Sequence, residues 1–96
     1  MAVYYITHRT SAGDPKVMKI YSSQVKATFE KFGGRKIVRT SEIEVIEGNW
    51  NPDRMTIIEF PDMKSLKAWY DSSEFAALKE MRHSVMSSNA MAVKGI

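Results

Sequence analysis

The chain has 96 residues, of which 26% are charged and 44% are hydrophobic, and its formal net charge is +3. These values are typical of an ordinary soluble domain, and we expect residues 1–96 to form one domain of a cytoplasmic protein. The absence of cysteine excludes a disulfide framework, a thiolate nucleophile and a cysteine-based metal site. The sequence shows neither a signal peptide nor an apolar run long enough to span a membrane, so we expect no membrane partner.

The positive charge is unevenly distributed along the chain. Residues 1–41 hold eight Lys or Arg and two acids, whereas residues 42–96 hold six and nine. The asymmetry could mark an anion-binding surface, or it could result from alternating charges on exposed faces. We favour exposed faces, because no run of basic residues is dense enough to follow a phosphate backbone, and we expect no nucleic-acid partner.

The first predicted elements are a buried strand and a helix. Residues Val3–Arg9 are rich in β-branched and aromatic side chains and are apolar at both parities through Ile6, as in a strand buried on both faces. Asp14 and Pro15 have the composition of an N-cap and a first helical position. Apolar residues then recur at helical spacing as far as Phe32, and Gly33–Gly34 predicts the end of the helix.

Two further strands are predicted in the middle of the chain. Arg35–Gly48 alternates polar and apolar residues, and we interpret it as one long edge strand, bent or bulged near Thr40–Ser41. Residues 49–53 predict a turn, in which Pro52 prevents continued pairing. In Arg54–Phe60, apolar residues occupy both alternating sets of positions, which predicts a central strand buried on both faces.

The C-terminal part predicts a split helix and a last strand. Asp62 is expected to cap a short helix from Met63 to Tyr70, and Asp71–Ser73 interrupts it. A second helical segment then runs to about Met86. Its cap is either Ser72 or Asp71, the latter in capping-box spacing with Glu74. The final stretch, residues 89–96, predicts the last strand.

The resulting order is β-α-β-β-α-β, which predicts a ferredoxin-like α+β fold. Two right-handed crossovers give a four-stranded antiparallel sheet with the helices on one face, the second helix being split near Asp71–Ser73. The first and third strands are central, and the second and fourth lie at the edges. The uncovered face still carries about half of the apolar side chains of the central strands, which is too much apolar area for a monomer to expose. A second copy of the same sheet is the simplest cover.

Glu59 and Arg82 are the most informative charges. Arg82 follows Leu78 by four residues, so it points into the apolar arc of the last helix and needs an acceptor. Glu59 is the one carboxylate within an apolar strand, and we expect the two residues to pair. The pair could orient a substrate or tune a general base, or it could brace the helix against the sheet. We favour the structural role.

The histidines and aromatic residues carry weaker signals. His8 ends its strand and could act as an acid–base group at the mouth of a pocket, but an exposed histidine is the favoured interpretation. His83 is expected to be solvated, and its spacing from Glu80 is insufficient to predict a metal site. Tyr70 is expected to face the core and Trp69 to lie on its flank, where stacking on a ligand is the less favoured role.

Several of these segments together resemble a known protein family. The chain reads IEGNWNPDRMTIIEFPDMKSLKAWYDSSEF from Ile46 to Phe75, and FGGRKIVR from Phe32 to Arg39. The combination closely resembles the bacterial DUF thirteen-thirty family, a domain of unknown function in the dimeric α/β-barrel superfamily, over almost the whole chain. The positions that carry the resemblance are Gly33, Gly34, Val38, Arg39, Glu47, Gly48, Trp50, Pro52, Arg54, Glu59, Phe60, Pro61, Trp69, Tyr70 and Arg82. The family typically has Ser-Pro-Glu-Tyr where this chain has Ser72–Phe75.

The resemblance implies a homodimer whose two sheets meet face to face as a barrel. It implies no established reaction and no cofactor. Relatives in the superfamily include antibiotic-biosynthesis-type monooxygenases and muconolactone-isomerase-like enzymes. These act on small organic molecules in a pocket between the helices and the sheet, and any transfer of activity to this chain is an analogy of fold.

Two classes of function therefore remain open. In the first, the protein is an enzyme or binder for a small organic molecule. Its pocket uses Tyr5, Arg39, Glu59, Trp69 and Arg82, and its catalytic candidates are Glu59, Arg82 and His8. In the second, it is a dimeric module without chemistry, in which these polar residues brace the fold. RNA binding is disfavoured, because the third strand lacks the aromatic residues of an RNP motif and the sheet face is needed for the dimer.

Overall fold

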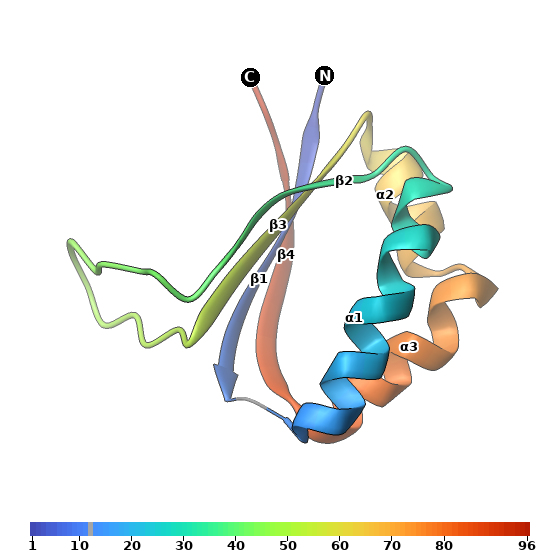
Figure 1. The fold of residues 1–96 in the computed structure, drawn as a ribbon. Coiled ribbons are helices and arrows are strands. Elements are labelled where there is room, and N and C mark those ends of the chain that lie inside the picture. The colour runs from blue at the N-terminus through green and yellow to red at the C-terminus, as the bar shows by residue number, and fades with distance from the viewer. Residues whose placement is uncertain (12) are drawn as a thin grey trace.

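The computed structural model describes residues 1–11 and 13–96, and it has one four-stranded antiparallel sheet with three helices on one of its faces (Figure 1). The elements in chain order are β1 (Val3–Ser11), α1 (Pro15–Glu30), β2 (Arg35–Thr40), β3 (Arg54–Phe60), α2 (Met63–Tyr70), α3 (Ser73–Val85) and β4 (Ser87–Lys94). The strand order is β2-β3-β1-β4, with β1 and β3 in the centre. The predicted ferredoxin-like α+β fold, with its split second helix, is confirmed. Among the described residues, no helix is long and apolar enough to cross a membrane.

The signals at the ends of α1 act as the sequence predicts. Asp14 caps the helix, its Oδ1 accepting a hydrogen bond from the backbone N–H of Lys16 at 2.9 Å, and Pro15 occupies the first turn. The chain leaves α1 through Gly33, whose φ of +83° is in the left-handed region that favours glycine. These local interactions fix where α1 begins and ends.

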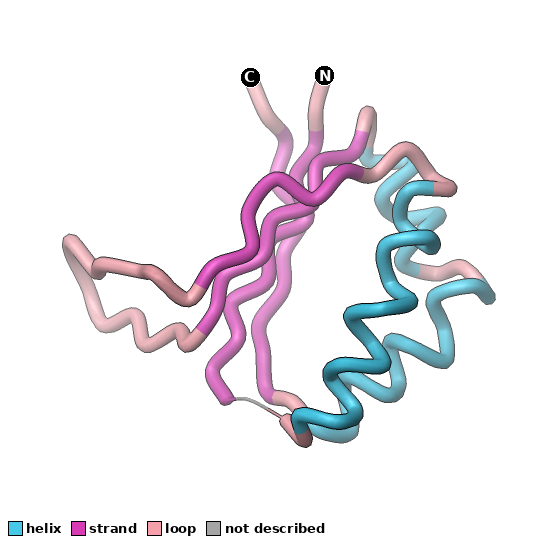
Figure 2. The backbone as a smooth tube through the Cα atoms, in the orientation of Figure 1, coloured by secondary structure: helices cyan, strands magenta, loops and turns pink. Residues whose placement is uncertain are grey.

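The predicted long second strand is wrong in its length and in the place of its bulge. The structure ends β2 at Thr40, and its register shifts between Lys36 and Val38 rather than at Thr40–Ser41. Thr40 lies opposite Met55, so continued pairing would bring the chain opposite Pro52, which has no N–H to donate. Residues 41–53 instead leave the sheet as an irregular arm that projects beyond β2 and β3 (Figure 2).

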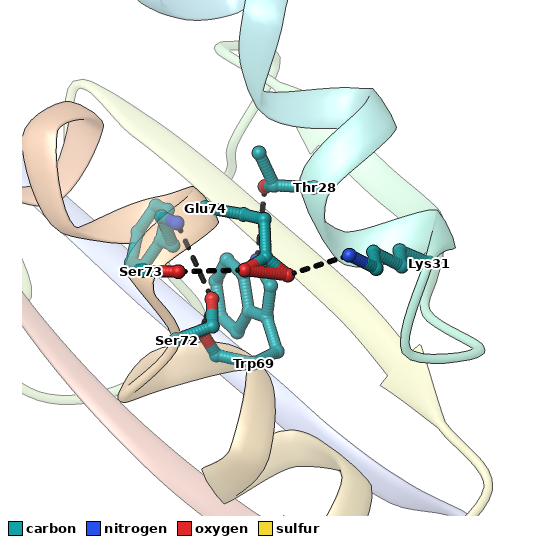
Figure 3. A network of polar contacts seen from close by, with 7 residues as sticks. Thr28, Lys31, Trp69, Ser72, Ser73 and Glu74 are labelled. Atoms are coloured by element: carbon teal, nitrogen blue, oxygen red, sulfur yellow. Dashed lines mark hydrogen bonds and ion pairs between the residues drawn. The ribbon is translucent and has the colours of Figure 1, made fainter.

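Trp69 lies at the centre of the core on the helix-facing side of the sheet. Its side chain is 0% exposed; it stacks on Phe75 with ring centroids 4.3 Å apart and meets Tyr5 edge-on at 5.1 Å. Its Nε1 donates a hydrogen bond to Thr28 Oγ1 at 3.0 Å, which satisfies the polar atom of the indole (Figure 3). The sequence-based placement of Trp69 on the flank is thus wrong, whereas Tyr70 packs against the core, the side that the sequence predicts for it. Leu66 and Trp69, three residues apart, are the buried side chains of α2, while Tyr70 is only half-buried.

A short polar network fastens α3 to α1 (Figure 3). Glu74 in the first turn of α3 forms an ion pair with Lys31 at 3.0 Å and accepts a hydrogen bond from Ser73. Ser72 Oγ accepts a hydrogen bond from Phe75 N at 3.2 Å and donates one to the carbonyl of Trp69. Ser72, rather than Asp71, is therefore the cap of α3, which decides between the two caps that the sequence left open.

The opposite face of the sheet carries apolar side chains. All three helices lie on the other side (Figure 1), and alternation along β1 and β3 brings Ile6 directly opposite Ile57 on this face. Met91 on β4 lies beside Ile6 and is 56% exposed. We call this surface the open sheet face.

Candidate functional site: a cationic pocket beneath the helices

A pocket lies between α1, α3 and the helix-facing side of the sheet. It has an inner cavity of about 60 Å³, and it continues into a wider mouth of about 400 Å³ that shares five of its lining residues. The polar residues lining the inner cavity are Tyr5, Thr7, Arg9, Tyr21, Ser22, Lys36, Arg39, Arg54, Thr56 and Arg82. All of them are cations or carry a neutral hydroxyl group, so the chemistry of the lining favours an anion.

Strand register arranges the lining of the pocket in layers. Cross-strand partners lie side by side, and every second residue of a strand faces the helices. The pairs on this side are Tyr5 with Ile58, then Thr7 with Thr56, then Arg9 with Arg54. The helix-facing surface therefore changes along β1 and β3 from apolar, through hydroxyl-bearing, to cationic at the mouth.

Arg82 comes from α3 and lies at the inner end of the pocket. It follows the buried Phe75 and Leu78 on one face of the helix, which turns the side chain under the helix, where it is 4% exposed. Its Nη2 lies 3.3 Å from His83 Nε2, while its Nε has no hydrogen-bond partner. Within residues 1–11 and 13–96, no carboxylate forms an ion pair with this buried guanidinium.

The neighbours of Arg82 are tyrosine hydroxyls. Burial lowers the pKa of Arg82, but the nearby Tyr5 and Tyr21 more than offset this effect, so its pKa lies above the ordinary value and the group stays cationic. Burial raises the pKa of Tyr5, and it raises that of Tyr21 to about 12 although Arg82 acts in the opposite direction. Both tyrosines are protonated at neutral pH. The buried Tyr5 hydroxyl has no hydrogen-bond partner among the described residues, so it is free to donate to an anion.

The mouth of the pocket gathers cations from three adjacent strands. Arg9 Nε forms an ion pair with Asp53 Oδ1 at 2.6 Å. Lys36, Arg39 and Arg54 form no ion pair with a described carboxylate. Burial, followed by the charge of Arg39, lowers the pKa of Lys36 and of Arg54. Because Arg9, Lys36, Arg39 and Arg54 gather here with Asp53 as the paired carboxylate among the described residues, the mouth has a positive potential.

The expected pair between Glu59 and Arg82 is not formed. Glu59 alternates with the buried Ile58 and Phe60, so its side chain lies on the open sheet face, where it accepts from Arg35 at 2.9 Å. The register places Arg35 directly opposite Glu59 on the neighbouring strand. The sheet therefore separates the two predicted partners, and Glu59 does not line the pocket.

The other predicted site residues divide between the pocket and the rest of the fold. Tyr5, Arg39 and Arg82 line the pocket together. Trp69 belongs to the core, and its ring is not part of the lining. His8 lies on the open sheet face, with its ring centroid 5.3 Å from that of Trp50, and its buried Nε2 has no partner among the described residues. His83 is exposed on α3, as the sequence predicted.

Sequence reasoning missed the other polar residues of the pocket, among them Tyr21, Lys36 and Arg54. Tyr21 recurs at the spacing of the apolar positions of α1, so its spacing alone does not distinguish it from a core residue. Arg54 shares the parity of Thr56 and Ile58, which is the one available signal that it faces the helices. The interpretation of the basic residues as scattered exposed charges also needs correction, because the fold brings several of them to one end of the pocket. In the described part of the chain, no group of three or more His, Asp and Glu side chains could hold a metal ion.

The fold and the pocket define a class of protein, the small ferredoxin-like α+β domains that bear a pocket beneath their helices. The family model for DUF1330, a domain of unknown function, matches residues 2–96, and the chain belongs to this family. Comparison with curated protein sequences gave no match.

Solved structures share the fold at low sequence identity. A protein of unknown function from Rhodopseudomonas palustris superposes with a TM-score of 0.77 at 15% identity, over 99% of this chain and 82% of that one. SnoaB, a cofactor-independent oxygenase from Streptomyces nogalater, superposes with a TM-score of 0.72 at 14% identity, over 99% of this chain and 93% of that one. A dimeric ferredoxin-like protein of unknown function from Jannaschia sp. CCS1 superposes with a TM-score of 0.73 at 10% identity, over 99% of this chain and 100% of that one. At these identities the likeness concerns the fold alone.

Proposed function

We propose that the protein is a homodimer that binds a small organic anion in the pocket beneath its helices. The observation that carries this proposal is Arg82, a buried guanidinium without a carboxylate partner at the inner end of the pocket. A buried cation without a partner costs several kcal/mol, so a fold that retains one gains from an anion that neutralises it. A carboxylate at this place would accept from Arg82 and from the protonated hydroxyls of Tyr5 and Tyr21.

The open sheet face supports the homodimer. It presents Ile6, Ile57 and Met91 on the side away from the helices, and similar folds include a protein described as a dimeric ferredoxin-like protein. A second copy of the same face would bury these side chains in an isologous contact. The anion pocket lies on the opposite side of the sheet, so it stays accessible in such a dimer.

Binding is proposed rather than turnover because of what lines the pocket. The described lining contains no carboxylate and no imidazole that could abstract a proton from a ligand. SnoaB is described as a cofactor-independent oxygenase, but a similar reaction here would require the ligand to enter already ionised. The pocket of this chain is suited to hold such an anion.

Calorimetric titration with hexanoate and benzoate tests the proposal. We expect saturable binding by the wild type, and at least about a tenfold loss of affinity in Arg82→Gln, because each charge-assisted hydrogen bond contributes about 1.5 to 3 kcal/mol. Lys79→Gln is the matched control, since it removes the same charge from the same helix outside the pocket. Circular dichroism checks that both variants fold, and Tyr21→Phe provides a second, milder change to the pocket. Equal affinities in Arg82→Gln and wild type, or no binding of either acid, would overturn the proposal.

A further inference from the structure

The pocket has a second group of cations, separated from Arg82 by the length of the cavity. Arg39 lies opposite Thr56, in the hydroxyl layer of the sheet, and Arg54 lies opposite Arg9, in the layer that follows it. Because residues that face one side of a strand recur about every 6.6 Å, these cations start about 7 to 13 Å from the layer of Tyr5 that adjoins Arg82. Their long side chains extend over the mouth.

Asp53 neutralises only part of this charge. Its carboxylate pairs with Arg9 at 2.6 Å, and it is the one acid in an ion pair at the mouth among the described residues. Arg39 and Arg54 are left without a carboxylate, on adjacent strands and next to Lys36. Like charges held this close repel one another, and an anion bound between them would remove that repulsion.

The two groups of cations differ in their exposure to solvent. Arg82 is buried in a narrow inner cavity with hydroxyl donors, which suits a single planar anionic group. Arg39 is exposed and lines both the cavity and the wider mouth, where a second anion remains partly hydrated. The apolar side chains of Val25 and Ile58 line the cavity, Ile58 in the layer of Tyr5, where they can contact the short hydrocarbon or aromatic body of a ligand.

We infer that the natural ligand is an organic dianion, with one anionic group on Arg82 at the inner end and a second, carboxylate or phosphate, between Arg39 and Arg54 at the mouth. This inference rests on the proposed function, because it needs the inner site to take an anion. It adds to that function a class of ligand and a means of selecting it. A monoanion fills only one of the two positions, and a neutral molecule fills neither.

Matched pairs of linear acids test this inference. The probes are the dicarboxylates succinate, adipate, suberate and sebacate, each compared by calorimetry with the monocarboxylate of the same chain length. We expect the best dicarboxylate to bind at least about tenfold more tightly than its matched monocarboxylate, with an optimum at a length that spans the pocket. The ω-phosphate analogue of that chain then shows whether the outer group is better as a phosphate or as a carboxylate.

Variants at the mouth separate the two anion positions. In the double variant Arg39→Gln/Arg54→Gln, we expect the affinity for the dicarboxylate to fall more than that for the monocarboxylate, so that the preference for the dicarboxylate falls to about one. The control is Lys64→Gln/Lys67→Gln, which removes the same two charges from exposed positions of α2 and should keep the preference.

The outcomes distinguish the inference from the function on which it rests. If monocarboxylates bind and every dicarboxylate binds no more tightly, the dianion inference fails and the proposed function stands. A preference that survives in the mouth variant, or disappears equally in the α2 control, also overturns the inference. If no acid of either series binds, the proposed function itself fails.

Discussion

Arg82 presents a conflict between stability and binding at the scale of a single residue. Its guanidinium is 4% exposed, has no carboxylate partner among the described residues, and leaves its Nε without a hydrogen bond. Bringing such a charge out of water opposes folding, because the surrounding hydroxyls replace only part of its hydration. This cost to the stability of the fold supports the proposal that Arg82 binds an anionic ligand.

We expect Arg82→Met to raise the free energy of unfolding in the absence of ligand, by about 1 to 3 kcal/mol. Methionine has a comparable length and fills the same space without a charge to desolvate. The same variant should lose the binding of organic acids. Urea denaturation measures the first effect, and a loss of more than about 2 kcal/mol would show that Arg82 braces the fold.

Because of Tyr21, we expect the free energy of unfolding to fall at alkaline pH. The folded-state pKa of Tyr21 is about 12, raised by burial from 10.0, so between these values the folded state holds a proton that the unfolded chain releases. The contribution of this proton to the free energy of unfolding is fully present below pH 10 and is lost as the pH rises towards 12. It amounts to about 2 to 3 kcal/mol in total. Urea denaturation across this range should show the decline.

Tyr21→Phe is the control for this effect, because it removes the titrating group and keeps the ring. The variant should lose less stability between pH 10 and 12 than the wild type. A direct titration of the tyrosinate ultraviolet band would contradict the prediction if Tyr21 ionised at its ordinary pKa.

At the scale of elements, the break between α2 and α3 shapes the core. The chain makes two short helices instead of one, because Ser72 turns out of the helical conformation with ψ at 154° and starts α3 afresh. Phe75 on the first turn of α3 can then stack on Trp69 at the end of α2. The local cap thus determines which aromatic residues meet in the core.

We expect Ser72→Ala to lower the free energy of unfolding by about 1 kcal/mol, because it removes the hydroxyl that accepts from Phe75 N. Asp71→Ala should have a much smaller effect, since the capping-box partner Glu74 bonds instead to Ser73 and Lys31. Thermal and urea melts of the two variants compare the alternative caps. A larger loss for Asp71→Ala would mean that α3 begins one residue earlier.

At the scale of the whole molecule, the sheet separates two surfaces of different chemistry. The helix-facing side holds the aromatic core and the cationic pocket, and the open sheet face holds apolar side chains with one Arg35–Glu59 ion pair. Glu59 was expected to pair with Arg82 on the last helix, but it pairs with Arg35 on the neighbouring strand. This separation allows the proposed dimer contact and the proposed anion site to coexist in one small protein.

We expect Ile57→Glu to break the proposed dimer, because it places a charge at the centre of the open sheet face, directly opposite Ile6. The interface should bury at least about 1,200 Å² in the wild type. Ile20→Glu is the matched control, since Ile20 is 47% exposed on α1. Light scattering should show a dimer for the wild type and the control, and a monomer or unfolded chain for Ile57→Glu. A folded Ile57→Glu dimer would place the contact elsewhere.

Much of the fold could be predicted because it depends on neighbours in the sequence. The caps at Asp14 and Asp62 act within a turn of their helices, and the apolar runs of β1 and β3 indicate burial on both sides whatever their partners are. The end of β2 could not be predicted in this way. It depends on which residues would lie opposite the continuing strand, Pro52 among them, which is a matter of register between distant segments.

The sequence by itself determined the order of the elements, their caps, the central and edge strands and the family to which the chain belongs. Only the tertiary structure decided which charges meet. Alternation along a strand says that Glu59 and Ile58 face opposite ways, but the packing of the helices decides which of the two sides becomes the pocket. Arg82 therefore meets the hydroxyls of Tyr5 and Tyr21 rather than a carboxylate, because the sheet lies between it and Glu59.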